Sequence, residues 1–320
     1  MSADIRPGFR LALLGALALV CIVAFMALGA NGNWSFVLPF RGAKLAVMVL
    51  VAYAIAVSSV LFQTITHNRI LTPAIMGFDA LYILIQASIV LGLGLDPLGN
   101  HDNAALKFAA EVVLMTGFAY LLFRFLFTGA VQSLHLMMLV GIVFGLLFRS
   151  LSSFIVRLID PNEFVVLQDR MFASFNTTKN ELLLVSVLAI AAASLVAWRL
   201  RHRYDVLALG RDMAVNLGID YRRTIMLTLM LIAVMVSVST ALVGPVIFFG
   251  LLVSNLGYLT AGTDRHRLVL PAAVLWAIVF LVGGQTLLER VLSLNATVSV
   301  VIEFVGGLLF LFLVTRKTQR

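Results

Sequence analysis

The chain has 320 residues, of which 62% are hydrophobic and only 12% are charged, and its formal net charge is +8 at pH 7. A soluble domain is about half apolar and about a quarter charged, so this composition excludes an ordinary soluble protein and indicates an integral membrane protein. The apolar runs are long and continuous, which favours spanning helices over the alternating strands of a barrel. An all-α, polytopic membrane fold is therefore predicted.

A helix needs about 20 apolar residues to cross a bilayer core of about 30 Å. About ten spans are predicted within one transmembrane domain (1–320), at residues 9–30, 44–66, 74–95, 104–127, 134–158, 181–198, 224–243, 250–261, 269–290 and 298–315. The first lacks a small-residue cleavage site, which indicates a retained helix. The eighth is too short to cross alone and is expected to be a half-span buried against its neighbours.

The basic residues predict the orientation of these spans, because Lys and Arg are enriched in cytoplasmic loops. If both termini are cytoplasmic, fifteen of the 23 lysines and arginines lie on that side. Eight remain at outward loops and span ends, namely Arg41, Lys44, Lys107, Arg149, Arg157, Arg170, Lys179 and Arg290. This bias predicts cytoplasmic N- and C-termini, and it attributes the positive charge to topology rather than to nucleic-acid binding.

One stretch between the sixth and seventh spans has the pattern of a helix outside the membrane: DVLALGRDMAVNLGIDYRR, residues 205–223. Asp205 suits a helix N-cap and Gly218 a C-cap, so one amphipathic helix from Val206 to Gly218 is predicted. Its apolar stripe, at a 3.6-residue period, consists of Val206, Leu209, Met213 and Leu217. The stripe either lies on lipid or on the underside of the bundle, or it docks into a groove on a cytosolic partner. Composition leaves both alternatives open.

The sequence shows no motif for catalytic or metal chemistry. It contains neither a G-x-x-x-x-G-K-[ST] nucleotide-binding loop nor an H-E-x-x-H zinc motif, and its five histidines are scattered without metal-ligand spacing. The single cysteine, Cys21, lies in the first span, so no disulfide forms within the chain. The chain is therefore predicted to be a non-enzyme without a metal or cofactor.

Two carboxyl groups lie at membrane depth, where an unpaired charge is costly. Glu111 falls inside the fourth span and Glu303 inside the last, beside Gly306 and Gly307. Each is either a protonated or paired packing residue or part of a polar path, and the neighbouring glycines favour a cavity at Glu303. The G-x-x-x-G motif at 141–145 predicts close helix packing or a dimer seam.

Several ordered motifs together resemble the FecCD family, the permease subunits of bacterial ABC importers for ferric siderophores, haem and cobalamin. They are LALGRDMAVNLGIDYRR, ALVGPVIFFGLLVSNLGYLTAGTDRHRLVLP and FVGGLLFLFLVTRK. The residues that fall in register with the second-helix signature of that family are Arg41, Lys44, Gln63, Asn68, Pro73 and Gly77. The resemblance extends over almost the whole chain from Arg41 onward.

The resemblance implies a ten-helix subunit in the lipid of the bacterial inner membrane that pairs with a second permease, as a homo- or heterodimer. It also implies two cytosolic ABC ATPase subunits and an extracytoplasmic solute-binding protein. In the family, the loop that corresponds to residues 204–223 folds into short coupling helices on the ATPase, and the matching residues here are Val206, Leu209, Gly210, Arg211, Met213, Ala214, Leu217 and Gly218. Basic residues that meet the binding protein correspond to Arg41, Lys44 and Arg290.

Departures from the family pattern, such as Ala43 for Pro and Ser254-Asn255 for Pro-His, concern the substrate more than the transport machinery. The stretch THNRILTPAIMGFDALY resembles the ferric-siderophore branch, so a ferric siderophore is favoured over haem or cobalamin. The channel is expected along the fifth and last spans, with polar contacts from Ser150, Ser152, Ser153 and Glu303. A rival hypothesis is an ion-driven secondary transporter that uses Glu111 or Glu303 as its coupling carboxylate.

Overall fold

The structure is a computed structural model that describes residues 7–30, 34–93, 104–128, 134–175, 180–292 and 298–318. These residues form helices joined by turns, and no strand occurs among them. Within the described ranges, seven helices are long and apolar enough to cross a membrane, and three shorter apolar helices accompany them. In chain order these ten helices correspond to the ten predicted spans, so the predicted all-α membrane fold is confirmed. Lys179, assigned above to the outward side, lies outside the described residues.

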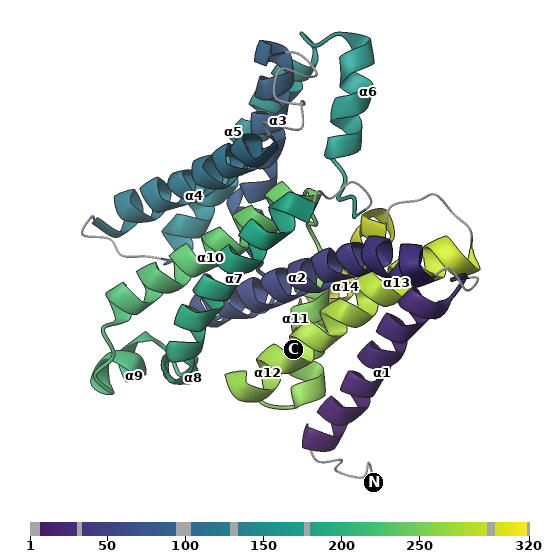
Figure 1. Ribbon diagram of the computed structural model, residues 1–320. Coiled ribbons are helices and arrows are strands. Elements are labelled where there is room, and N and C mark those ends of the chain that lie inside the picture. Colours follow the sequence, from purple (N-terminus) through teal and green to yellow (C-terminus); the bar gives the residue numbers. More distant parts are fainter. Residues whose placement is uncertain are drawn as a thin grey trace.

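The elements follow one another along the chain, and Figure 1 shows how they are arranged. They are α1 Pro7–Ala27, α2 Trp34–Thr66, η1 Pro73–Met76, α3 Phe78–Leu93, α4 Ala104–Thr128, α5 Leu134–Val156, α6 Pro161–Arg170, α7 Asn180–Arg199, α8 Arg201–Leu207, α9 Arg211–Asn216, α10 Tyr221–Val243, α11 Phe249–Ala261, α12 His266–Ile278, η3 Val279–Gly283, α13 Gly284–Thr286, η4 Leu287–Val291 and α14 Val298–Thr318.

Helices α2 and α10 form the centre of the bundle. In each of these two helices, 67% of the most apolar 18-residue stretch is buried, compared with 17% to 22% in α1, α5 and α7. Figure 1 shows α2 running through the middle of the molecule, where it packs against α10 and α12. A buried helix presents its whole circumference to protein, whereas the outer helices keep a wide apolar face for lipid or for another membrane subunit.

Apart from shifts of a few residues at helix ends, three features differ from the sequence prediction. Helix α2 begins at Trp34 rather than at residue 44, and it continues through Pro39. The third predicted span begins with the 3-10 turn η1 rather than with an α-helix. Gly77, which has a left-handed φ of 84°, separates η1 from α3. Helix α6 was not predicted at all, although its N-terminus carries a recognisable signal: Asp160 accepts a hydrogen bond from the Asn162 N–H at 2.8 Å, and Pro161 is the first helical residue.

The G-x-x-x-G motif of α5 is an internal packing site. A Cβ on Gly145 would lie 3.2 Å from the Cα of Gly77, and one on Gly141 would lie 3.1 Å from the Cα of Met76. Both glycines are buried against η1. The motif therefore lets α5 approach η1 closely within one chain, and of the two predicted uses it serves packing rather than a dimer seam.

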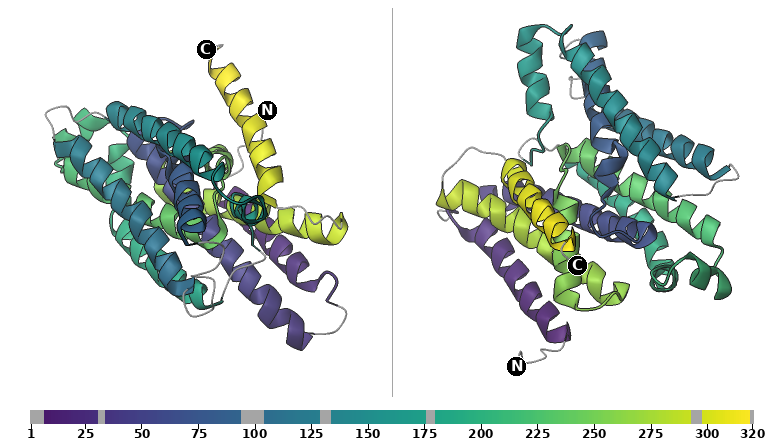
Figure 2. Two further views of the ribbon diagram at one scale, coloured as in Figure 1. Left: turned by 90° about the horizontal axis from the view of Figure 1, so that it is seen from above. Right: turned by 180° about the vertical axis from the view of Figure 1, so that it is seen from behind.

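The ninth span is one continuous helix, His266–Val291, that contains two π-helical segments, η3 and η4. π-turns inside helices often mark functional sites, and η4 carries the charged residues Glu289 and Arg290. The last helix, α14, extends away from the other helices (Figure 2). It contacts the rest through its N-terminal half, where Gly306 lies against Phe248 at the start of α11.

Candidate functional site

The loop between α7 and α10 folds into two short helices, α8 and α9, and not into the predicted single helix from Val206 to Gly218. The break lies at Gly210, whose φ of 104° places it in a region that residues with a Cβ seldom adopt. The predicted C-cap at Gly218 is confirmed. Its N–H donates to the carbonyl of Val215, and the next N–H, that of Ile219, donates to the carbonyl of Ala214, which together form a Schellman motif.

Four apolar side chains of this loop are exposed, and we call them the loop patch: Leu209, Met213, Val215 and Leu217. Among the other predicted coupling residues, Ala214 is buried and Val206 is half-buried, so both pack inward and support the loop. Figure 1 shows α8 and α9 at the same end of the molecule as the N-terminus. A cluster of exposed apolar side chains outside the spans is typical of a protein or lipid contact.

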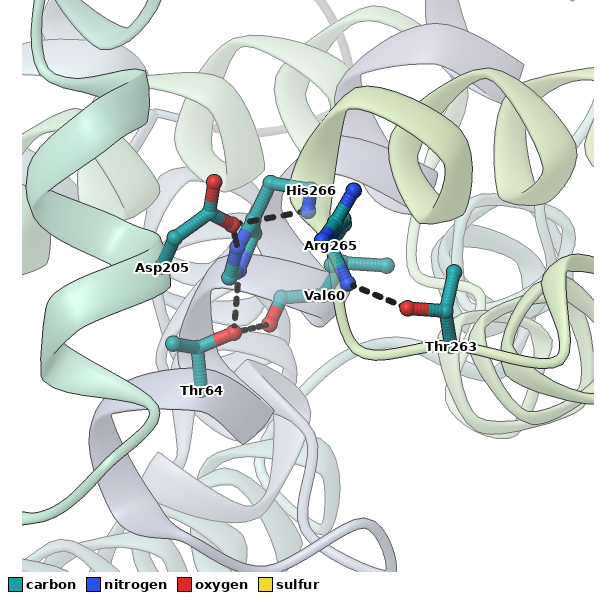
Figure 3. Close-up of polar contacts among 6 residues, drawn as sticks. All are labelled: Val60, Thr64, Asp205, Thr263, Arg265 and His266. Atoms are coloured by element: carbon teal, nitrogen blue, oxygen red, sulfur yellow. Dashed lines mark hydrogen bonds and ion pairs between the residues drawn. The ribbon is translucent and has the colours of Figure 1, made fainter.

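Asp205 does not cap the N-terminus of its own helix as predicted, because it lies inside α8 and its side chain reaches the first residue of α12 (Figure 3). Its Oδ1 accepts a hydrogen bond from the backbone N–H of His266 at 2.9 Å and lies 2.7 Å from Nδ1 of the same residue. On the other side of the ring, Nε2 lies 2.7 Å from Oγ1 of Thr64 on α2. His266 is only 2% exposed, and we call this arrangement the His266 junction.

A polar pocket of about 180 Å³ lies beside the His266 junction, and residues of α2, α11 and the α8–α9 turn line it. Arg69 forms an ion pair with Asp264, and its guanidinium lies 4.4 Å from the centre of the Tyr258 ring. His67 adopts a left-handed φ of 49°, and burial lowers the pKa of its imidazole. The loop patch thus adjoins a polar region that extends to the end of α2 rather than a purely apolar surface.

Two of the three predicted binding-protein residues have internal contacts at the opposite end of the molecule. The Arg41 guanidinium donates to four carbonyls at the end of α1, at 3.2 Å, 3.0 Å, 2.7 Å and 3.0 Å, those of Phe25, Met26, Leu28 and Gly29. The last carbonyls of a helix have no partner within it, and a cation there also complements the helix dipole. Arg41 therefore caps α1, a role that the sequence did not reveal.

Lys44 forms an ion pair with Glu289 of η4. The Nε2 of Gln285 donates to the same carboxylate at 2.6 Å. Arg290, the next residue of η4, is exposed and lies near Gly29 at the end of α1. The three basic residues thus gather around the same end of α1, α2 and η4, but only Arg290 among them presents an exposed side chain.

The predicted path residues do not share one face of α5. Ser150 and Ser153 are exposed, whereas Ser152 is buried and its hydroxyl donates to the carbonyl of Phe148 at 2.7 Å. Glu303 is half-buried on α14. Among the four, the hydroxyl of Ser152 therefore bonds within its own helix, Ser150 and Ser153 are exposed, and Glu303 is half-buried.

Sequence reasoning missed Asp79, a carboxylate that is only 5% exposed at the start of α3. It lines a cavity of about 30 Å³ together with hydroxyl-bearing residues, Ser58, Ser59, Thr72, Ser239 and Thr240. Its Oδ2 has no hydrogen-bond partner among the described residues. The signal was an acidic residue in the otherwise apolar run GFDALY.

Glu111, the other acidic residue at membrane depth, is buried and has two neighbours. It accepts a hydrogen bond from Gln86 of α3 at 2.8 Å, and the Lys107 ammonium lies 3.8 Å away on the same helix. These contacts match the paired packing role that was one of its two predicted alternatives. They hold α3 against α4 and weaken the rival hypothesis of an ion-coupled transporter.

Comparison with known proteins agrees with this geometry. The family model described as FecCD transport family matches residues 10–316. The petrobactin import permease YclO of Bacillus subtilis is 45% identical over 98% of this chain and 99% of its own length. The petrobactin import permease FatC of Bacillus anthracis is 36% identical over 87% and 78% of the two chains. A solved chain, described as an inward-facing metal-chelate-type ABC transporter, aligns with a TM-score of 0.83 at 21% identity over 97% and 99% of the two chains.

Among the described residues, ten apolar helices form a multi-pass membrane protein with an exposed apolar loop at one end and Arg41, Lys44 and Arg290 at the other. The chain belongs to the FecCD transport family, which matches nearly its whole length. The members of this family are permease subunits of ABC transporters, so the chain is a transport component. The family assignment made from the sequence motifs is thereby confirmed.

Proposed function

We propose that the chain is the membrane permease of an importer for a ferric siderophore of the petrobactin type. The observation that carries this proposal is the high identity, over almost the full length of both chains, with a relative named for petrobactin import. A second relative named for the same substrate supports it. This chain also departs from the general family pattern, for example at Ser254-Asn255. Such departures fit a specialised siderophore branch of the family better than the haem or cobalamin branches.

The proposed subunit lies in the bacterial cytoplasmic membrane with both termini in the cytoplasm, as the distribution of its basic residues indicates. This orientation puts the loop patch on the cytoplasmic side and Arg290 on the outer side. The chain contains no nucleotide-binding loop of its own, so energy has to come from partner subunits. We therefore expect two cytosolic ABC ATPases, a second permease subunit and an external solute-binding protein.

In the proposed mechanism, the loop of residues 204–223 docks on an ATPase through the loop patch. Closure of the ATPases moves α8 and α9, and the spans respond as rigid helices that alternate between outward and inward access. At the other end, Arg290 contributes a positive charge for the binding protein, while Arg41 and Lys44 fix the ends of α1 and α2 around it. Rim charges of this type mainly steer association.

The substrate is tested by deleting the gene and feeding the strain individual ferric siderophores under iron limitation. We expect loss of growth and of radioactive-iron uptake with ferric petrobactin, and normal uptake with a siderophore of different chemistry. Restoration by the wild-type gene on a plasmid is the control. Undiminished uptake of ferric petrobactin together with lost uptake of haem or cobalamin would show that the substrate assignment is wrong.

A further inference from the structure

Three helices meet at the His266 junction, and each contributes one polar group (Figure 3). Asp205 comes from α8 in the loop, His266 is the first residue of α12, and Thr64 lies near the end of α2. The distances from Asp205 to the ring and from the ring to Thr64 are both 2.7 Å. A carboxylate only accepts, so Nδ1 carries the proton of the first contact. On the other side of the ring, Nε2 contacts the Thr64 oxygen, whose own proton is donated to the carbonyl of Val60 at 2.9 Å.

Among the described residues, the imidazole of His266 is the polar link from α8 to α2. The backbone N–H of His266 already holds Asp205 at 2.9 Å, and this contact joins α8 to α12 whatever side chain follows. The contact with Thr64 needs the ring, because only its far nitrogen reaches α2. Removing the side chain therefore breaks the hydrogen-bonded link from α8 to α2 and leaves the bond from α8 to the backbone of α12.

Apolar contacts also hold α8 among the described residues. Tyr204 and Leu207 are each 1% exposed, and the Tyr204 ring lies 5.7 Å from the His266 ring. Apolar contacts are non-directional and tolerate sliding, whereas a hydrogen-bonded pair fixes distance and direction within narrow limits. A displacement of α8 is thus passed on with defined geometry through the imidazole rather than through the apolar contacts around it.

We infer that His266 is a positioning residue that transmits movement of α8 to α2 and α12. This inference rests on the proposed function, because it requires that an ATPase moves the loop. The inference assigns docking and transmission to different residues. The loop patch binds the ATPase, and the His266 junction transmits the movement of the loop to α2, the central helix of the bundle. Variants of the junction should therefore keep the ATPase bound but use it less productively.

The test uses the complete complex, with its ATPases, partner permease and binding protein, reconstituted in proteoliposomes. ATP hydrolysis and uptake of ferric petrobactin are measured together, and their ratio is the readout. We expect His266→Ala to retain stoichiometric ATPase but to lower the substrate moved per ATP by about tenfold, the size expected for losing one hydrogen bond to a charged group. Asp205→Ala is expected to show a similar loss.

A double-mutant cycle separates transmission from general damage. If both residues belong to one link, Asp205→Ala and His266→Ala combined should lower the ratio by no more than the stronger single variant. Thr64→Val removes the α2 end of the link, together with the hydrogen bond that its hydroxyl donates to the carbonyl of Val60 at 2.9 Å. It keeps the test possible if His266→Ala does not fold. Its matched control is Thr66→Val, because the Thr66 hydroxyl donates to the carbonyl of Phe62 within its own helix.

An unchanged ratio in His266→Ala and Thr64→Val would overturn the inference, and so would multiplicative losses in the double variant. Loss of the ATPase from the His266→Ala complex would also overturn it, because His266 would then serve docking. Failure of the proposed function looks different. In that case the wild-type chain itself would not retain an ATPase, or replacing the loop patch would leave the ATPase bound.

Discussion

Replacing Leu209 and Met213 with aspartate tests whether the loop patch binds the ATPase. The two side chains are 62% and 57% exposed, so somewhat more than half of each is available for burial by a partner. Full burial of a Leu or Met side chain stabilises by about 1.5–3 kcal/mol, so about 1–2 kcal/mol per residue is available here. Together about 2–4 kcal/mol is lost, which weakens docking roughly 30-fold to several hundredfold. Two buried carboxylates add to this loss.

The assay is co-purification of the ATPase with affinity-tagged permease, followed by titration of purified ATPase onto the permease in nanodiscs. The permease should fold normally, because exposed substitutions change the free energy of unfolding by less than about 0.5 kcal/mol. Val165→Asp is the matched control: Val165 is 65% exposed on α6, which Figure 1 places at the other end of the molecule. Wild-type ATPase affinity in the double variant would refute the coupling assignment and leave the loop patch as a lipid contact.

Four further predictions follow from the structure. Arg41→Ala should lower the free energy of unfolding by about 2–3 kcal/mol, because four carbonyls at the end of α1 lose the hydrogen bonds that the guanidinium donates. An unchanged melting temperature would contradict the capping role. Arg290→Glu should weaken binding-protein docking, most at low salt, without altering that temperature; docking unaffected at every ionic strength would count against its outward placement. Gly77→Ala should destabilise by about 1–3 kcal/mol through contact with α5, whereas Gly117→Ala, with open space around its Cβ, should not. Glu303→Gln should reduce uptake by folded protein if it lines the path, and normal uptake would favour packing.

The spans were predictable because each depends on a local property, the length of an apolar run. The prediction was wrong or incomplete where a distant contact decides the outcome. Helix α2 begins at Trp34, ten residues before the predicted start at residue 44. This additional helical segment places Arg41 at the end of α1, where it donates to the carbonyl of Leu28. The break at Gly77 serves a close approach by α5, whose glycines lie more than sixty residues further along the sequence. Neither partner is visible from the local pattern.

The loop shows how a correct location can accompany a wrong conformation. Leu209, Met213 and Leu217 follow a helical period, and the prediction of one helix rested on that spacing. Two short helices separated by Gly210 keep the same three side chains exposed, so the pattern alone does not distinguish them. Asp205 was assigned to a cap because Asp is favoured there. Its actual partner lies 61 positions further along the chain, beyond the reach of a local rule.

Helix α2 and the continuous helix His266–Val291 are bridged by polar contacts near both of their ends. At the loop end, Thr64 of α2 meets His266 at the start of α12, and at the other end Lys44 of α2 pairs with Glu289 of η4. Because α12 and η4 belong to one continuous helix, these contacts fix α2 and that helix relative to each other in both position and register. If α8 moves as we propose, this two-helix unit would carry the displacement to the residue beside Glu289, the exposed Arg290. In the proposed importer this connects ATPase docking with binding-protein docking through contacts within a single chain.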